Sequence, residues 1–221
     1  MAIDAISYTI TAFVYLALFA ALLTDKHRGK TKLFLLFAAI SSCVWAISVV
    51  LHSIAGLSFF ITQIFEIARN IFWLALIISM ISGIYIGRDL SILRKWLIPV
   101  SSALVVIGIT LALIYSIVPA GVDSYSHRNV ISTIQLVFAV AGIVLLEQLY
   151  RNIAVEQRWV IKFLCLGLLG SYIYSFYMYS DALLYQRIDP VLWQTRGFVE
   201  AIVVPLIAVS VFKDPLWSPD I

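Results

Sequence analysis

The segment FEIARNIFW, residues 65–73, places an acid, a base and an amide inside the apolar run 57–86. Glu66, Arg69 and Asn70 lie within five residues of one another. A charged side chain in the middle of a membrane span costs about 2.5–3.5 kcal/mol on insertion scales. Such residues therefore face the interior of a helix bundle, where they bind a ligand or proton or fix the positions of the helices.

A second apolar segment, 191–212, carries Arg196 and Glu200. With a rise of about 1.5 Å per residue, Glu66 and Arg196 both lie roughly 10 Å below the same surface, and Arg69 and Glu200 roughly 15 Å. We therefore predict that the two segments are neighbours and that their charges pair between helices in an interior network. Pairing within each helix, at spacings of three and four residues, is the alternative.

Aromatic and hydrogen-bonding residues accompany these charges at steps of three or four residues, which places them on one face of each of three helices. The same faces carry Gln63 and Tyr185. The faces are expected to converge on a polar and aromatic cavity in the outer half of the bundle. The predicted site consists of Glu66, Arg69, Asn70, Trp73, Tyr174, Tyr177, Asp181, Trp193, Arg196 and Glu200.

Gly197 and Pro205 are hinge candidates because they permit a kink in segment 191–212, although a packing bend is equally compatible with them. The site as a whole also has two interpretations. It is either a cavity that responds to a ligand or proton, or a structural network that only sets helix order and register.

The composition indicates the elements that position these residues. The chain has 221 residues, of which 62% are hydrophobic and 12% charged, whereas soluble domains average about 25% charged. We predict an all-α membrane protein, a seven-transmembrane helix bundle in one domain, 1–213, followed by the start of a cytoplasmic linker, 214–221. The expected spans are 4–24, 33–53, 58–86, 97–118, 129–149, 160–184 and 191–212.

Basic residues are distributed unevenly between the two sides of this bundle. One side and the tail carry Lys26, Arg28, Lys30, Lys32, Arg88, Arg94, Lys95, Arg151, Arg158, Lys162 and Lys213, and the other side carries Arg128 and Arg187. By the positive-inside rule the N-terminus is outside and the C-terminus cytoplasmic. The net charge of +3 then reflects topology and contact with anionic membrane lipids, and nucleic-acid binding is not indicated.

Several chemistries are not indicated. A retinal protein needs a Schiff-base lysine inside the last span, and the only lysine there, Lys213, lies at its end. His27, His52 and His127 are not spaced as ligands on one helix, so we expect no metal or haem site. No nucleophile elbow or phosphate-binding loop is present. We expect these 221 residues to be no enzyme and to bind no cofactor.

Several strings in the C-terminal half are unusual for apolar spans: EQLYRN (147–152), EQRWVIKFLCLGL (156–168), YSDALLYQRIDPVLWQTRG (179–197), VVPLIAVS (203–210) and DPLWSPDI (214–221). With these strings the chain resembles the membrane region of the PrsK family, the sensor histidine kinases of the exosortase/PEP-CTERM systems of Gram-negative bacteria. The resemblance extends over the whole chain and is strongest from Glu147 onward.

The resemblance implies a multi-pass sensor region in the bacterial inner membrane. In the family, the chain continues into cytoplasmic phosphoacceptor and ATP-binding domains, and only these would use ATP and Mg²⁺ and contact a response regulator. The family's catalytic residues have no counterpart in this sequence, which resembles a truncated sensor module ending at Ile221.

Two other functions remain open. One is a small seven-helix transporter, and the other is a structural membrane protein without a ligand. The sequence does not identify the stimulus, for which a small molecule, a lipid, a saccharide or a proton are all candidates. Both a monomer and a homodimer are compatible with it.

Overall fold

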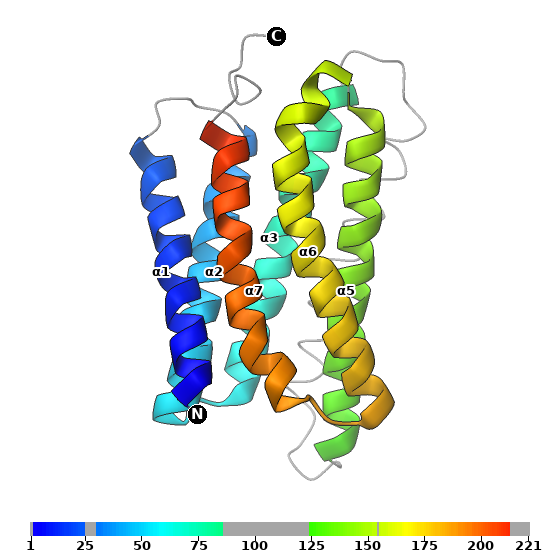
Figure 1. Cartoon of the computed structure of the whole chain (residues 1–221). Coiled ribbons are helices and arrows are strands. Elements are labelled where there is room, and N and C mark those ends of the chain that lie inside the picture. The colour runs from blue at the N-terminus through cyan, green and yellow to red at the C-terminus, as the bar shows by residue number, and fades with distance from the viewer. Residues whose placement is uncertain (1, 25–29, 86–123, 154, 213–221) are drawn as a thin grey trace.

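The computed structural model describes residues 2–24, 30–85, 124–153 and 155–212. These residues form long helices that lie side by side in one bundle, with the N-terminus at the end where α2 turns into α3 and α6 into α7 (Figure 1). The helices are α1 (Ala2–Thr24), α2 (Lys30–Ala55), α3 (Phe59–Tyr85), α5 (Ser124–Asn152), α6 (Val155–Tyr185) and α7 (Pro190–Phe212).

Each of these six helices is long and apolar enough to cross a membrane. The structure thus confirms an all-helical architecture typical of a multi-pass membrane bundle, and six of the seven expected spans coincide with helices to within a few residues. The remaining expected span, 97–118, lies outside the described residues. The presence of seven transmembrane spans and the orientation of the termini stay predictions.

The described helices follow one another round a closed ring. Close backbone contacts join α1 to α2, α2 to α3, α3 to α5, α5 to α6, α6 to α7, and α7 back to α1. Helices α3 and α7, which carry Glu66 and Arg196, contact each other directly through these side chains, as expected for neighbours. The more extensive backbone contacts of α7 are with α1 and α6.

Local sequence explains where the helices begin and end. Asp189 caps α7 by accepting hydrogen bonds from the amides of Val191 (2.7 Å) and Leu192 (3.3 Å), and Pro190 takes the first helical position, where its missing N–H is not needed. At the end of α2, Gly56 adopts φ 69°, and the Leu57 amide donates to the Leu51 carbonyl at 3.3 Å. This is a glycine C-cap, and it returns the chain into α3.

Gly197 allows α1 and α7 to approach closely. A Cβ at this position would lie 2.7 Å from Ser7 Oγ and 2.9 Å from the Ser7 carbonyl carbon. Thr11 Oγ1 donates across the same contact to the Gly197 carbonyl oxygen at 2.6 Å. Helix α7 runs without a break through Gly197 and Pro205. A hinge at these positions stays a prediction. The close packing of α1 against α7 is by itself a sufficient reason for a glycine at position 197.

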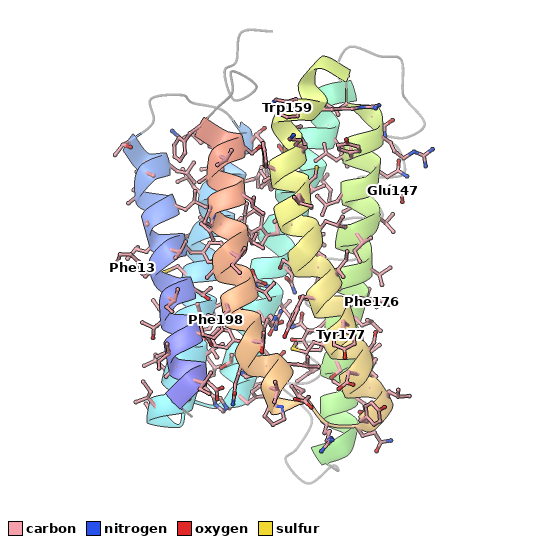
Figure 2. The ribbon with its side chains drawn as sticks, viewed as in Figure 1. Phe13, Glu147, Trp159, Phe176, Tyr177 and Phe198 are labelled. Atoms are coloured by element: carbon pink, nitrogen blue, oxygen red, sulfur yellow. The ribbon has the colours of Figure 1, made fainter. Side chains whose placement is uncertain are left out.

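Large apolar side chains cover the outside of the bundle. Phe13 is 71% exposed and projects away from α1 (Figure 2), and Ile54 and Leu184 are more than 70% exposed on other helices. A surface of this kind suits hydrocarbon and would promote aggregation in water. The exterior and the hydropathy of the helices thus support the same membrane setting.

Candidate functional site

The first ion pair of the interior joins α3 to α7. Arg196 Nη2 lies 2.6 Å from Glu66 Oε1, and both side chains are almost completely buried. Tyr179 on α6 donates its hydroxyl proton to the same carboxylate oxygen and accepts a hydrogen bond from Arg196 Nη1 at 3.1 Å. Ser175 Oγ, one helical turn earlier on α6, accepts from Arg196 Nη2 at 3.4 Å. The predicted pairing of Glu66 with Arg196 is thus confirmed.

The second ion pair lies deeper along the same two helices and runs in the opposite direction. Arg69 Nη1 on α3 lies 3.0 Å from Glu200 Oε1 on α7. The Ser171 hydroxyl donates to Oε1 of this carboxylate at 2.7 Å, and the Tyr15 hydroxyl donates to Oε2 at 3.1 Å. These four residues, Glu66, Arg69, Arg196 and Glu200, are called the quartet below. Their recorded ion pairs join the two helices, as predicted, and not residues within one helix.

Trp45 on α2 contacts both cations of the quartet. The Cζ atom of Arg69 lies 4.1 Å from the centroid of the indole, and that of Arg196 lies 5.0 Å from it. The side chain of Trp45 is completely buried, and the ring of Tyr8 packs edge-on against it with centroids 5.4 Å apart. Cation–π attraction contributes about 2 kcal/mol or more where water is excluded, so Trp45 helps to hold two like charges close together.

Hydrogen bonding in this interior is incomplete. Glu66 Oε2, Arg69 Nε and Arg196 Nε are buried without a hydrogen-bond partner among the described residues. Arg69 Nη1 is within ion-pair distance of Glu200, but its N–H direction does not make a hydrogen bond there. Each unsatisfied buried group costs about 1–3 kcal/mol, and more when it is charged. The quartet is thus neutral overall but retains polar atoms able to form further bonds.

The other predicted residues of α3 belong to adjacent contacts. Asn70 Nδ2 donates to Gln135 Oε1 on α5 at 2.8 Å, and Gln135 Nε2 donates to Gln63 Oε1 at 3.2 Å. Trp73 Nε1 donates to Ser42 Oγ on α2 at 3.0 Å. Asn70 and Trp73 are therefore buried, as predicted, but they link α3 to its ring neighbours rather than to the quartet.

The predicted face of α6 is largely wrong. Tyr177 is 56% exposed on the outside of the bundle, where Figure 2 labels it beside Phe176, and Tyr185 is 62% exposed. Asp181 is half-buried and forms no ion pair with the described arginines. Tyr174 donates to the Leu192 carbonyl at 2.8 Å and holds the start of α7. Tyrosine suits both an interior and a membrane interface, so spacing alone did not identify the inner face.

The inner face of α6 carries residues that the sequence analysis did not select: Ser171, Ser175 and Tyr179. They repeat every four residues, a spacing that was available as evidence. Tyr8 and Tyr15 of α1 were also missed. They are seven residues apart and flank Thr11, which gives α1 one polar stripe among apolar residues.

A cavity of about 390 Å³ opens at the end of the bundle where the N-terminus lies. Its lining residues are Asp4, Val49, His52, Ser53, Phe59, Ile188, Pro190 and Trp193. Trp193 connects this cavity to the interior, since its ring lies 5.8 Å from Arg196 Cζ and 5.9 Å from the ring of Tyr8. The Tyr8 hydroxyl donates to the Trp193 carbonyl oxygen at 2.9 Å. Trp193 is the predicted site residue that lines this cavity.

Metal ligands are not gathered at either place. Within the part of the chain that the structure describes, no group of three or more His, Cys, Asp or Glu side chains could hold a metal ion. The arrangement consists of a cavity at the bundle end and a buried network of ion pairs and hydrogen bonds beneath it. In comparisons with known proteins, no family model, no curated protein and no solved structure matches this chain.

Proposed function

We propose that this chain is the signal-sensing membrane region of a two-component sensor histidine kinase in the bacterial inner membrane, with seven spans and an external N-terminus. The resemblance of its sequence to the PrsK family supports this proposal. The strong excess of basic residues on one side supports the orientation. In this arrangement α7 is the last span, and its C-terminal end leads to the cytoplasmic output domains.

The observation that carries the proposal is the geometry of the quartet. Helix α7 contributes one residue to each ion pair, and both pairs connect it to α3. The same residues have a second set of partners, because Glu66 and Arg69 are three residues apart on α3, and Arg196 and Glu200 are four apart on α7. Exchange from pairs between helices to pairs within helices would release α7 from α3.

A stimulus would act on this exchange by binding one arrangement more tightly than the other, since a ligand with equal affinity for both shifts nothing. The movement of α7 would then be transmitted to the kinase domains. Bistable contacts between packed helices are a common basis for such transitions.

The first experiment is to determine the reading frame of the natural gene beyond the codon for Ile221. A frame that continues into a phosphoacceptor helix and an ATP-binding domain supports the kinase proposal, and a stop codon at that position contradicts it. The second experiment compares autophosphorylation of the full-length protein in nanodiscs for wild type, Arg196→Gln and the exposed control Arg187→Gln. Arg196→Gln should lock or abolish the response while the protein still inserts, and a wild-type response in this variant contradicts the proposal.

A structural role is the second candidate, and the nearly complete burial of the quartet favours it. In that case Arg196→Gln lowers the thermal stability of the bundle but leaves the response to stimulus unchanged. Measuring both quantities on the same preparations distinguishes the two functions.

A further inference from the structure

We infer that the cavity at the N-terminal end of the bundle binds an organic ammonium cation. The cavity is formed where four helices end or begin, with Asp4 from α1, His52 from α2, Phe59 from α3 and Trp193 from α7. Its volume of about 390 Å³ falls within the range of small-molecule sites, roughly 300–1,000 Å³.

The lining of the cavity favours a cation. Asp4 supplies a carboxylate, and the rings of Phe59 and Trp193 lie next to each other with centroids 5.8 Å apart and planes tilted by 55°. Aromatic faces attract ammonium groups, and quaternary ammonium ligands are characteristically bound between such rings. No Lys or Arg is among the described lining residues, so the lining offers an anionic ligand no basic side chain of these two types.

The aromatic wall is held in place before any ligand binds. His52 Nδ1 is hydrogen-bonded to the Leu57 carbonyl, which can only accept, so this nitrogen carries the proton. The imidazole also packs against Phe59 with ring centroids 5.6 Å apart. Trp193 is fixed from the other side by Tyr8. A preorganised wall of this kind loses little side-chain freedom on binding.

Two sources can supply this chemistry. The cation is either a free amine such as choline or the ammonium headgroup of a membrane lipid, because the cavity opens at the end of helices that suit a bilayer. Binding is independent of the proposed signalling function. The guanidinium of Arg196 lies 5.8 Å from the Trp193 ring. Only an effect of the bound cation on Arg196, and through it on signalling, rests on the proposed function.

The test measures equilibrium binding of radiolabelled choline to the full chain in nanodiscs of phosphatidylglycerol, and repeats it in nanodiscs of phosphatidylcholine. The variants are Asp4→Asn, which keeps the size of the side chain, and Phe59→Leu, which removes one aromatic wall. The matched control is Trp159→Phe at the opposite end of the bundle, where the indole is 69% exposed (Figure 2). Unfolding temperatures of all four proteins verify that each is folded.

We expect saturable binding in phosphatidylglycerol that weakens by about tenfold or more in Asp4→Asn and Phe59→Leu and is unchanged in Trp159→Phe. Unchanged binding in phosphatidylcholine identifies a free amine as the ligand, and suppressed binding there identifies the lipid headgroup. The inference is overturned if choline does not bind in phosphatidylglycerol, if folded Asp4→Asn binds as the wild type does, or if glucose displaces choline. Loss of choline binding would leave the kinase proposal standing, because that proposal is tested by the reading frame and by Arg196→Gln.

Discussion

Arg69 comes from α3 and Arg196 from α7, yet both lie against one indole. Their Cζ atoms are 4.1 Å and 5.0 Å from the centroid of Trp45. Two guanidinium groups this close repel each other unless carboxylates and a polarisable surface compensate them. Glu66 and Glu200 supply the carboxylates, and the face of Trp45 supplies the surface. Trp45, which lies in the apolar helix α2, is therefore part of the charge network.

Replacing Trp45 with Leu should destabilise the bundle strongly. The substitution removes a completely buried ring and its contacts with two cations, so we expect a loss of about 3–5 kcal/mol. The measurement is thermal unfolding in detergent followed by circular dichroism. Trp159→Leu, at an exposed position, serves as control and should change stability by less than about 0.5 kcal/mol. Equal effects of the two substitutions would contradict the role assigned to Trp45.

The ion pair between Glu66 and Arg196 should show strong coupling in a double-mutant cycle. Glu66→Gln or Arg196→Gln alone leaves a buried charge without its partner and should cost about 3–5 kcal/mol, whereas the double variant should recover a large part of this loss. The exposed pair of Glu147 with Arg151, 3.2 Å apart, provides the control, and Glu147→Gln should cost less than about 1 kcal/mol. Additive losses in the cycle would show that the two side chains do not depend on each other.

Adding a methyl group at Gly197 should push α7 away from α1. In Gly197→Ala the new Cβ would lie 2.9 Å from the main-chain carbon of Ser7, which cannot move without shifting α1. We expect a loss of about 1–3 kcal/mol. Gly170→Ala on α6 is the matched control, since nothing lies within 4 Å of its Cβ, and there the higher helix propensity of alanine should be neutral or stabilising. A neutral Gly197→Ala would disprove the close approach of these helices.

The side-chain amides of Asn70, Gln135 and Gln63 form a hydrogen-bonded chain between α3 and α5, and stability should depend on Gln135 at its centre. Gln135→Ala removes the partner of both Asn70 and Gln63 in a buried position, and we expect a loss of about 1–3 kcal/mol in unfolding free energy. Thr133→Ala lies two residues away, where the residue is exposed and its hydroxyl donates to the Asn129 carbonyl of its own helix. The control should change stability by less than about 0.5 kcal/mol, and a similarly small effect of Gln135→Ala would contradict the contact.

The sequence predicted the six described helices and the ion-pair partners in the quartet, and both predictions rest on the geometry of a membrane-spanning helix. In a membrane span, length and depth follow directly from the rise per residue, so the positions of Glu66 and Arg196 along their spans were enough to match them. The order of helices round the ring did not follow, because it depends on close contacts such as the one at Gly197. The inner face of α6 was misjudged since Tyr177 and Tyr179, only two residues apart, point in nearly opposite directions and are equally compatible with an apolar span.

The pairing of the quartet determines how it would respond to an electric field. Moving one elementary charge through a full membrane potential changes the energy by about 2.3 kcal/mol per 100 mV. The quartet contains two cations and two anions, and each cation lies beside an anion at the same depth. Exchange of partners therefore transfers almost no net charge along the membrane normal, and the resting voltage of a cell would do little work on it. A switch built from these residues would respond to chemical contacts while remaining insensitive to the energised state of the membrane.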